Sequence, residues 1–287
     1  MAIDLGNGND NFTVTNAAGE SVRGFGGNDT LTGGSGRDAL NGNEGDDILF
    51  GTGNDTLYGG QGNDALLAND NGSGDVLYGG KGVDVLIGSQ AGGTLAFGGK
   101  GSDVIYGAGP RAILFGDLGD DVIFSKGNSS LAGGSFVYNP AINDGNDTLV
   151  GGFDNQVLAG DTGNNTYLFQ NVVSRTLNGR TVLEGGYGGV DAIQRFQLGD
   201  NGYKDVILLT NLVSGDTVTI SDQNSPNSIT GSVISITGSV QNVIDVELIG
   251  ISSLLTSNSN SIFVNGNVLD FSKGSFDAGS NVFTYRV

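Results

Sequence analysis

A nine-residue repeat dominates the first third of the chain and limits the folds that it can adopt. Between Gly24 and Leu67 five near-copies follow one another, the fourth one residue short, and each reads G-G-x-G-x-D-x-U-x, where U is a large apolar residue. Glycine permits a tight turn at the start of the unit, and the apolar residue faces inward on a very short strand. A period this short predicts a parallel β-helix, in which stacked windings share one core.

The aspartate of each unit lies where the turn ends and backbone carbonyl groups converge. Carboxylate and carbonyl oxygens are the ligands that Ca2+ prefers. The units between Gly24 and Leu67 resemble the RTX, or haemolysin-type, calcium-binding nonapeptide repeat, and further copies follow them along the chain. The resemblance implies that two units close one winding of a right-handed parallel β-roll, and that calcium lies between successive windings on the same side.

Counting units along the chain places the aspartates on two edges of such a roll. Asp10, Asp29, Asp47, Asp64, Asp84, Asp103 and Asp121 follow one another at spacings of 17 to 20 residues, one winding each, and form the long ladder. Asp38, Asp55 and Asp75 form the short ladder on the other edge, with Thr94 and Ala112 at its later positions. Asp147 resumes the unit after an irregular stretch, and we expect it to bind calcium as well. Seven acids leave six gaps and three leave two, which predicts about eight calcium ions.

The net charge of the chain, −19, also points to a cationic partner. The 12 basic residues are scattered singly, so no basic patch is expected for a nucleic acid or an anionic membrane. Stacked carboxylates about 4.8 Å apart repel one another by about 1 kcal/mol per pair in water. Burial of one main apolar residue per unit, roughly 1.5–3 kcal/mol, does not offset the ordering of its backbone at roughly 1–2 kcal/mol per residue. The roll should therefore be largely disordered without calcium.

Two rows of apolar side chains follow from the repeat. The inward row lies two residues after each acid position and comprises Phe12, Leu31, Leu40, Leu49, Leu57, Leu66, Leu77, Leu86, Ile105, Leu114 and Ile123. The last position of the unit points outward, and aromatic residues recur there: Tyr58, Tyr78, Phe97 and Phe115 on one side and Phe50, Tyr106 and Phe124 on the other. Exposed aromatic stripes mark contact surfaces, although these rings could also simply cover the edges of the turns.

The chain divides into two predicted regions. Residues 1–199 form the calcium-binding roll, with an insertion near 125–143 that contains Pro140, and residues 200–287 form a β-rich C-terminal cap or assembly region. A cap is expected because the open end of a β-helix exposes its core and its unpaired strand edges. Strands are predicted at 206–209, 218–220, 233–236, 243–249, 261–271 and 282–287.

The residues needed for common catalytic sites are missing. The chain has no histidine, no cysteine and no G-x-S-x-G, which excludes H-E-x-x-H zinc sites and Ser-His-Asp or Cys-His triads. The acids outside the repeat are scattered, and we expect them on a solvated surface: Glu184, Asp191, Asp245, Glu247 and Asp277. We therefore expect no enzyme, with a polysaccharide lyase or hydrolase as the weaker alternative.

The expected function is that of a secreted, calcium-binding structural protein. Its roll would fold on calcium and self-associate as a homo-oligomer or polymer in an extracellular surface layer, matrix or filament. The alternative is a calcium-dependent adhesin or glycan-binding protein with a cell-surface polysaccharide as partner. The N-terminus lacks the basic and apolar segments of a cleavable signal peptide, and no apolar run reaches membrane-spanning length. The resemblance implies type I secretion with an uncleaved C-terminal signal.

Overall fold

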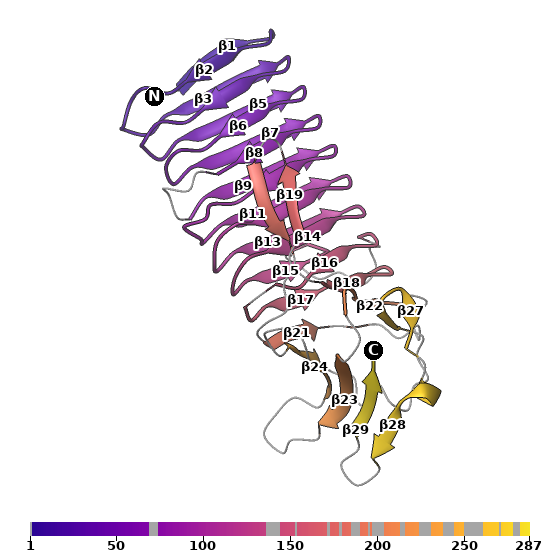
Figure 1. Cartoon of the computed structure of the whole chain (residues 1–287). Coiled ribbons are helices and arrows are strands. Elements are labelled where there is room, and N and C mark those ends of the chain that lie inside the picture. The colour runs from indigo at the N-terminus through magenta and orange to yellow at the C-terminus, as the bar shows by residue number, and fades with distance from the viewer. Residues whose placement is uncertain are drawn as a thin grey trace.

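The structure is a computed structural model. It describes residues 2–68, 74–135, 144–152, 154–170, 173–177, 180–184, 190–194, 196, 204–212, 216–223, 231–237, 244–249, 261–269, 271–277 and 282–287. In this part the chain is all-β apart from one short 3-10 helix, η1 (Phe271–Lys273). Figure 1 shows the strands stacked as windings along one long axis, with β1 at one end and the C-terminal strands at the other. The predicted parallel β-roll is confirmed.

Two sheets form the walls of the roll, and consecutive strands of the repeat region alternate between them. Sheet A contains, in spatial order, β1 (Ala2–Gly6), β3 (Ser21–Gly26), β5 (Ala39–Glu44), β7 (Thr56–Gln61), β9 (Val76–Lys81), β11 (Leu95–Lys100), β13 (Ile113–Leu118), β15 (Ser130–Ala132), β17 (Val157–Ala159), β21 (Val190–Gln194), β25 (Ile244–Ile249), β24 (Gly231–Thr237), β23 (Thr217–Gln223), β29 (Val282–Arg286) and β28 (Ser275–Asp277). Sheet B contains β2 (Asn11–Thr13), β4 (Thr30–Thr32), β6 (Ile48–Phe50), β8 (Ala65–Leu67), β10 (Val85–Ile87), β12 (Val104–Gly107), β14 (Val122–Ser125), β16 (Thr148–Val150), β18 (Thr166–Phe169), β22 (Val206–Leu209), β26 (Ile262–Val264) and β27 (Asn267–Val268). A separate antiparallel hairpin consists of β19 (Val173–Leu177) and β20 (Arg180–Glu184).

The core of the roll is a ladder of aliphatic side chains in register. In sheet B, Leu86 pairs with Leu66 on one side and with Ile105 on the other. In sheet A, Leu77 pairs in the same way with Leu57. All of the predicted inward residues are fully buried except Phe12, which is partly buried at the end of the roll. The inward row is therefore confirmed, because parallel strands in register place equivalent residues of each unit directly above one another.

Parallel pairing continues into the C-terminal part of the chain. β21 pairs with β25 in sheet A, and β22 pairs with β26 in sheet B. Beyond β25, sheet A becomes antiparallel through β24, β23, β29 and β28. The strands predicted at 206–209, 218–220 and 233–236 are present as β22, β23 and β24. Strands on both sides of residue 200 belong to the same two sheets. The predicted division into a roll, residues 1–199, and a C-terminal region, residues 200–287, therefore stays a prediction.

Residues 125–135 continue the roll. β15 pairs in parallel with β13 and with β17, and Leu131 lies in the core between Leu114 and Leu158. This corrects the first part of the expected insertion, since a regular winding passes through it. The rest of that stretch, 136–143 with Pro140, lies outside the described residues.

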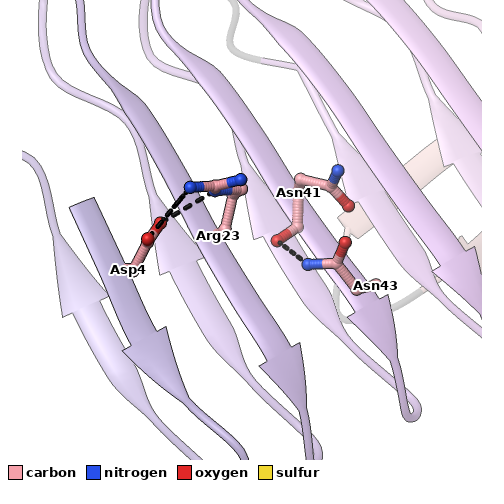
Figure 2. Close-up of polar contacts among 4 residues, drawn as sticks. All are labelled: Asp4, Arg23, Asn41 and Asn43. Atoms are coloured by element: carbon pink, nitrogen blue, oxygen red, sulfur yellow. Dashed lines mark hydrogen bonds and ion pairs between the residues drawn. The ribbon is translucent and has the colours of Figure 1, made fainter. Parts of the chain in front are cut away.

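The outward faces of the two sheets differ in exposure. In sheet A the outward row is polar at first, and Figure 2 shows the guanidinium of Arg23 donating to the carboxylate of Asp4 at 2.8 Å. The next member, Asn41, is followed by Tyr58, Tyr78, Phe97 and Phe115 in register. These four rings stack, with centroids 5.0, 5.1 and 5.2 Å apart.

The outward row of sheet B is buried instead. Its side chains form a second apolar cluster of Leu67, Ile87, Tyr106, Phe124 and Val150, together with Ala108. Tyr106 and Phe124, and Phe115 in the row of sheet A, were expected on the surface, and this expectation is wrong because all three are buried. Phe50, earlier in the same row, is 37% exposed. No helix in the described ranges is long and apolar enough to span a bilayer.

Candidate metal centre

The long ladder lies on the edge where strands of sheet A lead into strands of sheet B. The full G-G-x-G-x-D sequence is present in the turns of Asp64, Asp84 and Asp103. In every turn from Asp29 to Asp147 the fourth position is a glycine with a positive φ, for example 134° at Gly62 and 127° at Gly82. A Cβ atom at Gly82 would overlap with the carbonyl oxygen of Gly62 in the preceding winding. Two features therefore require glycine at this position: the positive φ of the backbone and the close approach of the preceding turn.

Hydrogen bonds link the acids of the long ladder from winding to winding. The Oδ1 atom of each aspartate accepts a hydrogen bond from the backbone N–H of the ladder residue one winding earlier, as when Asp64 N donates to Asp84 Oδ1 at 2.8 Å. The chain of bonds runs through Asp10, Asp29, Asp47, Asp64, Asp84, Asp103, Asp121 and Asp147 at 2.7–2.9 Å. The structure thus brings together all the acids that the sequence assigned to this edge, and adds Asp147.

From Asp29 onward, the second carboxylate oxygen of each of these residues is buried without a hydrogen-bond donor. This holds for Oδ2 of Asp29, Asp47, Asp64, Asp84, Asp103, Asp121 and Asp147. Burial raises the pKa of Asp64 and of Asp84 to about 7, and neighbouring carboxylates add to the shift. Burial likewise raises the pKa of Asp121 to about 9. A buried acceptor without a partner is costly and points to a cationic ligand.

A glycine and a backbone carbonyl lie close to each of these oxygens. A Cβ atom at Gly79 would lie 2.5 Å from Asp84 Oδ2 and 2.5 Å from the carbonyl oxygen of Gly98 in the next winding. Gly98 is placed in the same way against Asp103 Oδ2 and the carbonyl of Gly116. The first glycine of the unit therefore packs against oxygens of two windings, and a larger residue there would overlap with them.

These oxygens fit calcium, which takes six to eight hard oxygen ligands from carboxylates and carbonyls. Within the described ranges, no three acidic side chains approach closely enough to hold an ion by themselves. Backbone carbonyls would therefore have to complete each coordination shell. One aspartate per winding, from Asp29 to Asp147, would supply the charge.

The short ladder has a different arrangement. Asp38 Oδ1 and Asp55 Oδ1 accept from the N–H groups of Glu20 and Asp38 one winding earlier, as on the other edge. Their Oδ2 atoms, however, accept from N–H groups of their own turns: Gly34 donates to Asp38 at 2.6 Å, and Thr52 and Gly53 donate to Asp55 at 2.8 and 3.1 Å. Asp75 continues this ladder, and its Oδ2 is buried without a donor.

The backbone of the turn explains the contrast. On the long edge the strands of sheet A extend through the glycines, and the N–H of the fourth position bonds to the next winding, as from Gly62 N to the carbonyl of Lys81 at 2.9 Å. On the short edge the strands of sheet B end earlier, so the N–H groups of Gly34 and Thr52 can turn toward the aspartate. Calcium binding by Asp38, Asp55 and Asp75 stays a prediction.

Some ladder residues were missed or misplaced by the sequence analysis. Asp191 was expected on a solvated surface, which is wrong: it is fully buried, and its Oδ1 accepts from Gln156 N at 2.9 Å on the short edge. Asp205 is equally buried and accepts from Asn165 N at 2.8 Å on the long edge. Both precede a buried isoleucine by two residues, Ile193 and Ile207, and this spacing was the signal that could have found them.

Comparison with known proteins agrees with this geometry. The profile of the RTX calcium-binding nonapeptide repeat matches residues 23–53, 51–72, 67–95, 90–109 and 143–168. No relative was found among curated proteins. The matched residues cover the turns of Asp29 to Asp103 and that of Asp147, where the unpartnered carboxylate oxygens lie. The chain therefore carries RTX calcium-binding nonapeptide repeats, stacked in a parallel β-roll.

Proposed function

We propose that this protein is a secreted, non-catalytic structural protein that self-associates through the outward face of sheet A once calcium has ordered the roll. The observation that carries the proposal is the contrast between the two outward faces. The row on sheet B is buried from Leu67 to Val150, whereas on sheet A Tyr58 and Tyr78 are 40% and 36% exposed and only Phe115 of the four rings is buried. On the same sheet, Ile113 in β13 is 46% exposed. An apolar row left open on a flat sheet supports contact with another sheet face.

The stacking of these rings supports a protein partner over a sugar. The ring planes of Tyr58, Tyr78 and Phe97 are within 4° of parallel at centroid distances of 5.0 and 5.1 Å. Rings this close and parallel overlap face to face, since side-by-side rings in one plane cannot approach so closely. Their edges rather than their faces then point to solvent, whereas a sugar ring would need a free aromatic face. The alternative is a calcium-dependent adhesin or glycan-binding protein. Saturable binding of a glycan by the isolated monomer would favour it.

Sedimentation velocity in millimolar calcium tests the assembly. We expect wild type to form species larger than a monomer, and the double variant Tyr58→Ser/Tyr78→Ser to shift toward monomer. Phe50→Ser is the matched control, because Phe50 is also 37% exposed in an outward row but lies on sheet B. A monodisperse wild-type monomer at high protein concentration in calcium contradicts the proposal.

The proposed setting is an extracellular surface layer, matrix or filament reached by type I secretion. Support comes from the repeat family and from a charge of −19 that divalent ions can neutralise. Negative-stain microscopy with calcium and then with EDTA separates the forms: ordered polymers that dissolve on chelation support it, and amorphous aggregates in both conditions count against it.

A further inference from the structure

One turn of the short edge has a glutamine where the repeat has its aspartate. Gln156 is 1% exposed and precedes the buried Leu158 by two residues, which is the spacing of the acid in the repeat. Its backbone N–H donates to Asp191 Oδ1 at 2.9 Å, as the ladder residues do from winding to winding. Gln156 therefore occupies the acid position of the short ladder, with a neutral amide in place of the carboxylate.

The side-chain amide of Gln156 contacts the preceding winding. Its Nε2 donates to the carbonyl oxygens of Ser125 and Gly127, at 3.0 and 3.4 Å. The carbonyl of Ser129 in the same turn accepts from Val157 N at 3.0 Å, which places this turn one winding earlier on the same edge. An amide nitrogen carries two hydrogens, so one side chain serves both carbonyls. The orientation of the amide is fixed, because Oε1 in the place of Nε2 would face two carbonyl oxygens.

The equivalent contact on the long edge is made by two acceptors. A Cβ atom at Gly79 would lie 2.5 Å from Asp84 Oδ2 and 2.5 Å from the carbonyl oxygen of Gly98. A Cβ atom at Gly152 would overlap with the Nε2 of Gln156 and would lie 2.7 Å from the carbonyl oxygen of Ser125. Two buried acceptors close to one another call for a cation, whereas a donor and an acceptor satisfy each other.

Neutral side chains close the neighbouring turns of the short edge as well. The hydroxyl of Ser125 lies 3.1 Å from the carbonyl oxygen of Gly107, one winding earlier, and 2.7 Å from the hydroxyl of Ser129. Both hydroxyls thus have a partner within the chain. The acid positions of four consecutive windings on this edge carry no charge: Thr94, Ala112, Ser129 and Gln156.

One atom of Gln156 is compatible with a different role. Its Oε1 is buried without a hydrogen-bond donor, and an amide oxygen can bind calcium. The two roles differ in what removal of the side chain does to bound calcium. Counting ions therefore separates them.

We propose that Gln156 takes the place of a calcium ion on the short edge. The hydrogens of its amide bind the turn carbonyls that a metal would otherwise bind, so this winding closes without an ion of its own. Together with Thr94, Ala112 and Ser129 it forms a stretch of the short edge that binds no calcium. The long edge of the same windings carries Asp103, Asp121 and Asp147, whose Oδ2 atoms lack donors.

Counting bound calcium in an isosteric variant tests the proposal. Gln156→Glu exchanges the amide nitrogen for oxygen, so that a carboxylate without a donor faces the carbonyls of Ser125 and Gly127. The full-length protein is dialysed to equilibrium against calcium, and bound metal is measured by elemental analysis. We expect the variant to bind one ion more per chain than wild type. The same number of ions in a folded variant overturns the proposal.

Asn155→Asp is the matched control, because it makes the same amide-to-carboxylate change at the adjacent, exposed residue of the same turn. It should bind as many ions as wild type. A gain of one ion in this variant too would assign the extra ion to added charge alone, and the proposal would then be wrong.

Gln156→Ala decides the question if the glutamate variant does not fold. Its loss leaves the carbonyls of Ser125 and Gly127 without this donor, so the alanine variant should bind as many ions as wild type and unfold at a lower denaturant concentration in saturating calcium. Loss of one ion would show that Oε1 is a calcium ligand. An unchanged unfolding midpoint would show that the amide does not hold the two windings together. Either result overturns the proposal.

Discussion

Two turns of the short edge, those of Asp38 and Asp55, use the aspartate of the repeat differently from the long edge. On the short edge, Asp38 directs Oδ1 to the winding before it and Oδ2 to the N–H of Gly34 in its own turn. On the long edge, Asp64 makes the first contact but leaves Oδ2 buried without a donor. The nonapeptide pattern is the same at both places, so the repeat alone does not determine whether a carboxylate needs a metal. The backbone of the preceding turn determines it, through the N–H groups that it leaves available.

The largest effect expected from this comparison is loss of the roll on calcium removal. The long ladder holds seven buried oxygens without donors, and without a cation their charges oppose stacking. In excess EDTA the circular dichroism of the roll should fall toward that of a disordered chain, and proteolysis should become rapid. Equal compactness and protease resistance with and without EDTA would show that hydrogen bonds suffice on both edges.

Protonation of the buried aspartates at low pH should partly substitute for calcium in stabilising the long edge. Burial raises the pKa of Asp47, Asp64 and Asp84 from 3.8 to about 7, so the folded chain binds protons that the unfolded chain releases. This contribution is complete below pH 4 and is lost as the pH rises through about 7. In EDTA, compactness should therefore increase between pH 8 and pH 5, as small-angle scattering can measure. A calcium-free chain that is equally expanded at both values contradicts this expectation.

Core truncations should not distinguish the two edges. Leu86 in sheet B and Leu77 in sheet A are both fully buried in the same cluster. Leu86→Ala and Leu77→Ala should each cost about 2–5 kcal/mol in calcium. Denaturant unfolding measures both, and a difference larger than that range would mean that the edges impose different packing on the core.

The smallest effects should separate the edges most clearly. Asp64→Asn removes a charge from an oxygen without a donor, so it should lower bound calcium while leaving the calcium-free chain no less stable. Asp55→Asn places an amide against the N–H groups of Thr52 and Gly53, which should cost about 1–3 kcal/mol even in EDTA. The destabilisation is measured in EDTA at pH 5, where we expect the calcium-free chain to be compact. Equal behaviour of the two variants in calcium titration would remove the distinction.

Much of the roll and of the ladder could be predicted from local spacing. Leu31, Leu49 and Leu66 each follow an aspartate by two residues, and in parallel register this places them above one another. Asp191 could not be placed by counting, because 35 residues with the β19–β20 hairpin separate it from its ladder neighbour Gln156. Once the period is interrupted, only the folded chain shows which winding a residue joins.

The sequence by itself determined the period, the inward row and the alternation of acids between two edges, because each depends on nearby residues and on the geometry of short strands. The tertiary structure alone decided three further properties. It determined that Tyr106 is buried while Tyr78 is exposed, since coverage depends on distant parts of the chain. It placed the carboxylate of Asp144 and the Cβ atom of Asp161, from neighbouring windings, against Gly134. It also decided which carboxylates lack donors, because a backbone N–H bonded between windings is no longer available to a side chain.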